Sequence, residues 1–239
     1  MMFATFKKII TTAAITSLIA GVLLTFLQQV QVVPLILEAE KYEHSGQPTA
    51  PGALAAHGNT HAPSHEPPNE QEWQPQEGLE RNLFTGVANI AVALGFALLL
   101  GAAIALRETT PGWRSGLLWG LGGYIAFFVA PALGMSPELP GSHSGELEHR
   151  QLWWAATSIA TAAGLALAIF NGRYTVKALG AILLILPHLV GAPQPDAHHV
   201  GVVPAELLRA FIVATAVTNA AFWLALGGFY GLVHKRLAG

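Results

Sequence analysis

Long apolar runs separated by polar segments dominate the chain. A helix needs about 20 apolar residues to cross about 30 Å of hydrocarbon. Six runs approach that length, and the small residues within them are typical of helices that pack closely in lipid. They cover Ile9 to Leu37, Leu83 to Leu106, Gly116 to Met135, Leu152 to Phe170, Val176 to Val190 and Leu207 to Val233. The pattern predicts an all-α, polytopic integral membrane protein with six transmembrane helices in a single transmembrane domain, residues 1–239.

Two of these runs allow alternatives. The fifth is short and contains Pro187, so a broken or re-entrant helix would also fit it. The first follows Lys7 and Lys8, as a secretory signal would, but it is longer than the apolar region of a signal peptide and lacks a small-residue cleavage site. We therefore expect the first run to be an uncleaved span.

Charge predicts the orientation of the helices. With six spans, one side carries Lys7, Lys8, Arg107, Arg114, Arg173, Lys177, Lys235 and Arg236, and the other carries Lys41, Arg81, Arg150 and Arg209. Basic residues favour the cytoplasmic side of a membrane. We expect a bacterial inner-membrane protein with both termini in the cytoplasm.

The runs also suggest an internal repeat. Each even-numbered run begins with a glutamate close to an arginine, and each odd-numbered run contains a proline toward its outer end: Pro34, Pro131 and Pro187. Aligned on the arginines, Ala93 coincides with Ala162, and Ala97 coincides with Ala166. The pattern predicts three repeated helical hairpins, although alanines also coincide by chance. Proline-interrupted helices at matching positions are typical of transporter substrate sites.

Composition narrows the possible functions. Charged residues make up 11% of the chain, against roughly 25% in soluble domains. The net charge of −2 gives no basic face for nucleic acid, so we expect the lipid bilayer and not nucleic acid as a partner. The chain has no cysteine, and it lacks the phosphate loop, HExxH and GxSxG motifs. We expect neither an enzyme nor a tightly bound cofactor.

Histidines gather in the predicted outer loops. Residues 41–76 are rich in histidine and proline and are predicted to form a flexible extracytoplasmic loop. Within this loop His57, His61 and His65 recur at every fourth residue, and a later loop contains His198 and His199. Imidazole is the commonest side-chain ligand for transition metals. These histidines therefore indicate weak metal capture, with an unspecific solvated loop as the alternative.

Polar residues within the spans have two interpretations. His188 follows Pro187 near the outer end of the fifth run, where an ionisable group needs a partner. That partner is either a metal ion, or a hydrogen-bonding group in a purely structural role. Gln28, Gln29 and Gln31 lie deep in the first run, Asn89 lies in the second and Asn219 in the sixth. They are predicted to hydrogen-bond between helices, with a polar permeation path as the alternative.

Several longer strings resemble the CbtA family of predicted cobalt transporter subunits. They cover residues 31–40, 131–141, 150–154, 186–195 and 203–209, and the resemblance extends over nearly the whole chain except residues 42–76. It implies about five spans, cobalt uptake linked to cobalamin synthesis, and a small single-span, histidine-rich partner, CbtB. It points to Glu38, Glu138, His188 and Glu206 as matching positions to be tested as metal ligands.

We therefore expect a membrane transporter subunit that takes up a divalent transition-metal ion. Co²⁺ is the favoured substrate and Ni²⁺ the alternative, because both ions accept nitrogen and oxygen ligands. One rival is a metal-binding or assembly membrane protein that delivers ions to a partner without transporting them. A second rival is a membrane enzyme, which would need a structured centre of three or more ligands.

Overall fold

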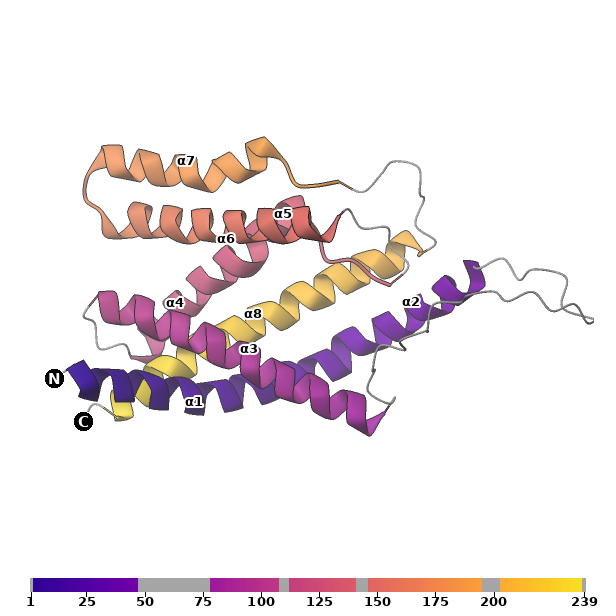
Figure 1. The fold of residues 1–239 in the computed structure, drawn as a ribbon, viewed down its shortest axis with the longest axis horizontal. Helices are drawn as coiled ribbons and strands as arrows, with labels where there is room; N and C mark the ends of the chain where they lie inside the picture. Colours follow the sequence, from indigo (N-terminus) through magenta and orange to yellow (C-terminus); the bar gives the residue numbers. More distant parts are fainter. Residues whose placement is uncertain (1, 47–77, 108–111, 141–145, 195–202, 238–239) are drawn as a thin grey trace, which may run out of the picture.

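The computed structural model of the chain describes residues 2–46, 78–107, 112–140, 146–194 and 203–237. These residues form helices and their connections, without a strand (Figure 1). In chain order the elements are α1 (Met2–Leu27), η1 (Gln28–Val32), α2 (Val33–Gly46), α3 (Leu79–Leu106), α4 (Trp113–Tyr124), η2 (Ile125–Val129), α5 (Ala130–Gly134), α6 (Leu147–Phe170), α7 (Tyr174–Val190) and α8 (Ala205–Arg236).

The predicted all-α, polytopic membrane fold is confirmed. Five helical segments are long and apolar enough to cross a membrane: Thr5–Tyr42, Leu79–Leu106, Trp113–Gly134, Leu147–Phe170 and Ala205–Arg236. The fifth predicted span is the shorter apolar helix α7, which has 17 residues. Most of the predicted loop at residues 41–76 lies outside the described residues.

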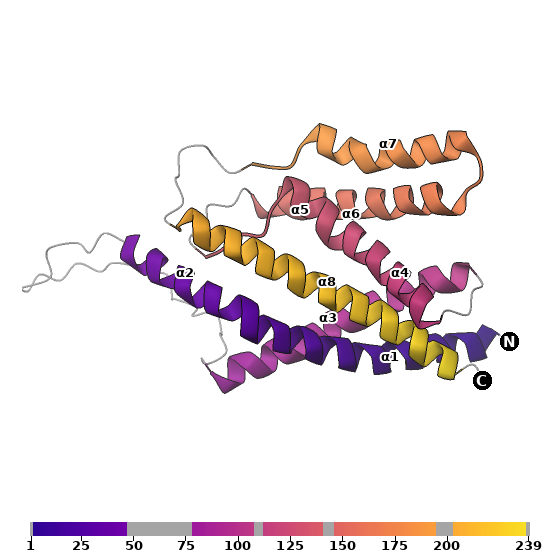
Figure 2. The same ribbon diagram turned by 180° about the vertical axis from the view of Figure 1, so that it is seen from behind.

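The short helix α7 is unbroken and runs back along α6. It continues through Pro187 and packs against α6 in the opposite direction (Figures 1 and 2). The N- and C-terminal ends of the described chain lie at the same end of the molecule, as an even number of passes requires. With a rise of 1.5 Å per residue, α7 is about 26 Å long, slightly less than a typical hydrocarbon core of about 30 Å.

Two of the spans contain a π-helical turn just before a proline. The turn η1 joins α1 to α2, and the turn η2 joins α4 to α5. Pro34 and Pro131 each follow the last residue of their π turn by two positions. Proline has no N–H, so it cannot donate a hydrogen bond to the preceding turn. The shared spacing supports the predicted similarity of the first and third spans.

The packing of the helices departs from three equivalent hairpins. The helices α1 and α3 pack together as a hairpin, but α4 packs chiefly against α8, and α6 packs chiefly against α7. The alanines that coincide in the sequence also differ, because Ala93 and Ala97 are buried whereas Ala162 and Ala166 are exposed. The repeat thus describes the order of the helices and the place of the prolines, but not the helix contacts.

Glycines explain why α4 packs against α8. A Cβ atom placed on Gly227 of α8 would lie 2.7 Å from the backbone nitrogen of Gly120 in α4, and would also meet the carbonyl oxygen of Gly116. The two backbones therefore touch, as is common between membrane helices that carry small residues at this spacing. Only glycine fits at this crossing.

Amide side chains connect α1 and η1 to α3. The Asn89 amide donates hydrogen bonds to Oγ1 of Thr25 at 3.0 Å and to Oε1 of Gln28 at 2.6 Å. Closer to the start of α3, Nε2 of Gln29 donates to Oδ1 of Asn82 at 3.0 Å. The predicted interhelical hydrogen bonding is confirmed for Gln28, Gln29 and Asn89. The Asn219 amide instead donates to the carbonyl oxygen of Thr215 within its own helix, α8, at 2.9 Å.

Candidate functional site

Glu138 lies where the chain leaves α5 and passes the outer end of α6. The helix α5 ends at Gly134, and the segment that follows is extended between Pro137 and Pro140. This path brings Oε2 of Glu138 to 2.8 Å from Nη2 of Arg150, which belongs to the first turn of α6. Both side chains are about three-quarters buried, with 26% and 23% of their surfaces exposed. The ion pair therefore lies in a partly shielded environment.

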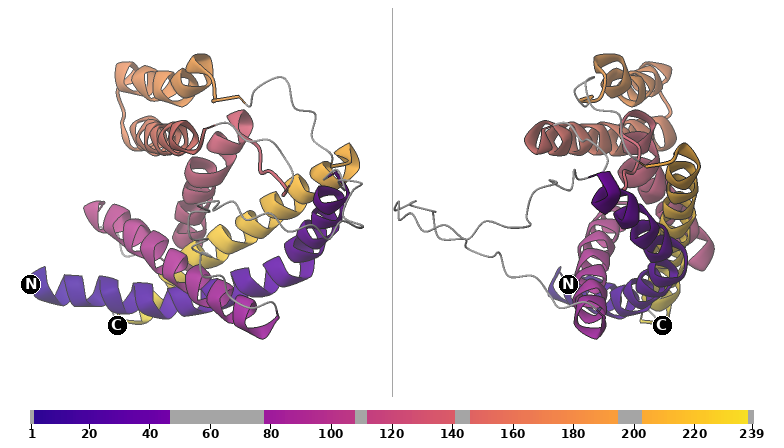
Figure 3. Two further views of the ribbon diagram at one scale, coloured as in Figure 1. Left: turned by 45° about the vertical axis from the view of Figure 1, so that its right-hand side comes forward. Right: turned by 90° about the vertical axis from the view of Figure 1, so that its right-hand side faces the viewer.

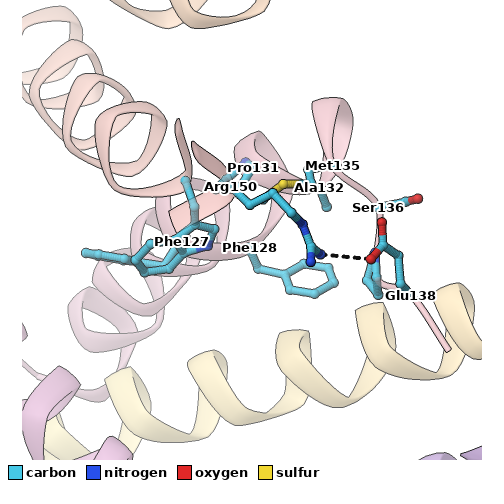
Figure 4. Close-up of a pocket in the computed structure, with 10 residues that line it drawn as sticks. Phe127, Phe128, Pro131, Ala132, Met135, Ser136, Glu138 and Arg150 are labelled. Atoms are coloured by element: carbon cyan, nitrogen blue, oxygen red, sulfur yellow. Dashed lines mark hydrogen bonds and ion pairs between the residues drawn. The ribbon is translucent and has the colours of Figure 1, made fainter. Parts of the chain in front are cut away.

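A groove surrounds this ion pair. Its volume is about 200 Å³, and Figure 4 shows the Arg150 guanidinium directed at the Glu138 carboxylate beside the ring of Phe128. A second, wider hollow of about 420 Å³ adjoins it and shares Met135, Arg150 and Trp154. The groove is lined by Phe127, Phe128, Pro131, Ala132, Met135, Ser136, Pro137, Glu138, Arg150 and Trp154.

The groove walls are mostly apolar, and this strengthens the electrostatic interaction between charges inside the groove. Charges interact more strongly near low-dielectric walls than in open water. A cation that enters the groove meets one carboxylate, and it must compete with Arg150 for that carboxylate. The groove therefore provides a position at which an incoming metal ion would exchange with an arginine.

The structure brings Glu38, Glu138 and Glu206 to one outer junction. A cluster of buried apolar residues joins η1 and α2, the segment after α5, and α8: Val32, Ala39, Leu139 and Phe211, with Leu207 packed against them. Glu38 directly precedes Ala39, Glu138 precedes Leu139, and Glu206 precedes Leu207. The three predicted carboxylates thus belong to segments that meet at the same place.

The three carboxylates differ in their surroundings. Glu38 pairs with Lys41 at 2.6 Å, and its side chain is 45% exposed. Glu206 is exposed in the first turn of α8. Only Glu138 lines the groove. Glu38 and Glu206 therefore lie at the surface, whereas Glu138 lies in the partly shielded groove.

His188 lies at the outer end of the α6–α7 hairpin. Its imidazole is half-buried and edge-on to the ring of Trp153, with 6.1 Å between the ring centroids. A Cβ atom placed on Gly134 would lie 2.8 Å from Cζ2 of Trp153 and 3.1 Å from Cβ of Ala192. Trp153 is thus wedged between α5 and the end of α7. Its chain neighbour Trp154 lines the groove, so His188 and the groove occupy adjacent faces of α6.

The described residues do not form a closed metal centre. Among them, no three histidine, aspartate or glutamate side chains come together in a way that could hold an ion. The remaining candidates His57, His61, His65, His198 and His199 lie outside the described residues, and their metal binding stays a prediction. Among the described residues, the candidate site is therefore an open groove with one carboxylate.

Sequence reasoning missed Arg150 and Trp154 as parts of this site. Both belong to one of the strings that resemble the CbtA family, as Glu138 does. Glu138 and Arg150 carry opposite charges and lie in two different strings of this resemblance, and this was a signal that the sequence offered. Spacing alone could not show that Glu138 and Arg150 meet, because the connection between the two helices has no regular period.

Comparison with known proteins gives one match. No curated protein sequence and no solved structure matches the chain significantly. A family model described as a probable cobalt transporter subunit, CbtA, matches residues 6–235, which is almost the full chain of 239 residues. The match agrees with the resemblance found in the sequence and with the membrane fold. The chain therefore belongs to the CbtA family of probable cobalt transporter subunits.

Proposed function

We propose that this chain imports Co²⁺ from the outer side of a bacterial inner membrane. The observation that supports this best is the half-shielded Glu138 carboxylate in an apolar groove, on a member of a cobalt transporter subunit family. The family description names a probable cobalt transporter subunit, which is not an enzyme class. A groove with one anionic oxygen ligand suits the transient binding that transport requires better than it suits a permanent metal site.

Entry of the ion begins with electrostatic attraction. Glu38 and Glu206 lie on segments that meet beside the groove and raise the local concentration of cations. A Co²⁺ ion then displaces Arg150 from Glu138, because a divalent charge outcompetes a monovalent one at the same distance. The released guanidinium stays close and favours departure of the ion toward the membrane interior.

The charge distribution supports an orientation of the protein in the membrane. Arg107, Arg114, Arg173 and Lys177 lie at the ends of helices that share one side with both termini (Figure 1). The excess of basic residues supports a cytoplasmic location for that side. The groove then faces the periplasm. A reporter fused to the C-terminus that is active only in the periplasm would contradict this orientation.

Two further features belong to the same proposal. The histidines at residues 57, 61 and 65 capture metal weakly at the outer face, since imidazole binds Co²⁺ and Ni²⁺ well. The family description names a subunit, so a second chain takes part. A small single-span, histidine-rich membrane protein like CbtB fits that role, because it would add imidazole ligands to the carboxylates described above.

The proposal is tested by cobalt flux into liposomes that contain the purified protein, with and without the histidine-rich partner. We expect Co²⁺ to accumulate, and Glu138→Gln to raise the half-saturating concentration about tenfold, which corresponds to about 1.4 kcal/mol. Glu148→Gln is the matched control, because Glu148 is exposed in the first turn of α6 and does not line the groove.

Three results would change the proposal. Equal accumulation with and without the protein would reject transport by the chain. Metal binding without flux would support the role of delivering ions to a partner. Stronger flux with Ni²⁺ than with Co²⁺ would replace the substrate but keep the groove.

A further inference from the structure

Buried polar groups without partners gather on α6. The described structure gives no hydrogen-bond partner to Nε1 of Trp153 or to the hydroxyls of Thr157, Ser158 and Thr161. The three hydroxyl residues are at most 1% exposed. Each unpaired buried group costs about 1–3 kcal/mol, so four within nine residues require an explanation.

The helices on both sides of α6 lack donors in the same region. In α7, Pro187 has no N–H to offer the carbonyl oxygen of Leu183. On the other side, η2 and α5 contact α6, and Pro131 can donate neither to Phe127, at α-helical spacing, nor to Ala126, at π-helical spacing. The hydroxyls of α6 can donate hydrogen bonds. They therefore lie between two segments in which a proline cannot donate to a backbone carbonyl oxygen.

The spacing of these residues along α6 places their side chains on the side that faces α7 and on the side that faces the groove. Trp153, Thr157 and Thr161 recur every fourth residue and therefore share one face of the helix. This face meets His188 at its outer end, through Trp153, and α7 at its inner end, where Gly164 contacts Gly180.

Ser158 links this face to the groove. It lies one helical turn below Trp154, whose ring lines the groove and lies 6.2 Å from the ring of Phe127 in η2. The unpaired hydroxyls thus continue inward from both candidate entry points, the Glu138 groove and His188.

We propose that Thr157, Ser158 and Thr161 line a hydrated path that carries the cation inward from the groove. The proposal rests on the proposed function for the identity of the cation. Water molecules or a partly hydrated ion would satisfy these hydroxyls, which have no hydrogen-bond partner in the described structure, and would also offer donors to the carbonyls that the prolines cannot serve. Carbonyl oxygens of interrupted membrane helices coordinate ions in this way in secondary transporters.

The inner end of this path is closed by backbone contact. A Cβ atom placed on Gly180 would lie 2.7 Å from the carbonyl oxygen of Gly164, and one on Gly164 would lie 2.8 Å from that of Gly180. Passage beyond Thr161 therefore requires α7 to move away from α6. Among the described helices α7 makes substantial contact only with α6, so this movement breaks few other contacts.

The absence of cysteine allows a direct test on the full chain in its membrane. Single substitutions Thr157→Cys and Thr161→Cys each introduce one thiol of nearly the same size as threonine. Thr16→Cys on α1 is the matched control, because Thr16 is equally buried and its hydroxyl also lacks a partner. A small cationic methanethiosulfonate reagent is added in water, with and without Co²⁺.

We expect the thiols at positions 157 and 161 to react at least about tenfold faster than the thiol at position 16, and Co²⁺ to slow them. Equal reactivity at all three positions would overturn the proposal. Thr157→Val, which keeps the volume and removes the hydroxyl, should lower cobalt flux severalfold, whereas Thr16→Val should not.

The two proposals fail in different ways. Fast labelling of a protein that moves no cobalt would leave the path standing and reject the proposed substrate. Cobalt flux with unreactive thiols at positions 157 and 161 would keep the transport function and reject this path.

Discussion

The body formed by α1, α3, α4 and α8 differs from the α6–α7 hairpin in how tightly it is held. Each helix of the body contacts at least two others, whereas α7 makes substantial contact with α6 alone among the described helices. Figure 3 shows the hairpin at one side of the molecule, connected to the body through α4, η2 and α5. The body is thus built as a fixed support, and the hairpin as a part that can shift.

The two regions also differ in whether their buried polar side chains have hydrogen-bond partners. In the body, Asn89 joins two helices through two hydrogen bonds. Hydroxyls without partners occur there too, but they are spread over α1 and α8. On α6 such groups are concentrated within nine residues and flanked by proline-containing helices. The regions thus differ in that the body joins helices through paired amides, whereas the unpaired groups of α6 lie beside two proline-containing helices.

The largest effect should come from a methyl group at the crossing of α4 and α8. In Gly120→Ala the new Cβ meets the carbonyl oxygen of Trp223 and lies 3.3 Å from Cα of Gly227. Neither backbone can move, because α8 is also packed against α1. We expect a loss of about 3 kcal/mol or more, measured as a lower thermal unfolding midpoint in detergent.

A parallel change in the hairpin should be milder. In Gly164→Ala the new Cβ meets the flexible Leu184 side chain at 3.0 Å and the Gly180 carbonyl oxygen, and α7 can yield. We expect a loss of about 1 kcal/mol. Gly122→Ala in α4 is the control, since its Cβ would have no neighbour within 4 Å. Equal damage from Gly120→Ala and Gly164→Ala would show that the hairpin is as rigid as the body.

The change at His188 should affect transport and leave stability nearly unchanged. His188→Ala and His188→Gln should both abolish high-affinity cobalt uptake while expression and insertion stay normal. Glutamine keeps hydrogen bonding but lacks the imidazole ligand. The control is His234→Gln in α8, whose ring stacks on Tyr230 at the opposite end of the molecule. Wild-type uptake by His188→Gln would assign the imidazole to packing against Trp153.

The smallest effect should follow deletion of residues 46–76. The segment is rich in proline and has no apolar periodicity, so the body should fold without it. Uptake should fall only at limiting cobalt, because weak capture raises the local ion concentration without forming the pathway. Membrane insertion and the thermal midpoint are the measurements, and a loss of insertion would show that the segment is part of the fold.

The spans were predictable because lipid leaves few solutions for the backbone. A polar backbone group in hydrocarbon must be paired within the chain, so each long apolar run has to become a helix. The π turns were not predictable in this way. One additional residue in a turn hardly changes an apolar pattern, and Pro34 and Pro131 indicated only that the helices were disturbed there.

Contacts between distant segments were less predictable than the helices. Three carboxylate candidates were identified by family resemblance, yet only the structure shows that Glu138 pairs with Arg150. The choice of α8 rather than α6 as the main partner of α4 depends on facing glycines. Glycines are frequent in many membrane helices, so their sequence positions do not reveal which helices they bring together.

The shortness of α7 has a consequence for the surrounding lipid. Its 17 residues span about 4 Å less than a typical hydrocarbon core. Lipids adapt to a short helix by thinning, at a cost of a fraction of a kcal/mol per ångström. The leaflets should therefore draw together beside the hairpin. An ion that passes along α6 would then cross an insulating layer thinner than a typical bilayer core, and acyl-chain length should tune its rate.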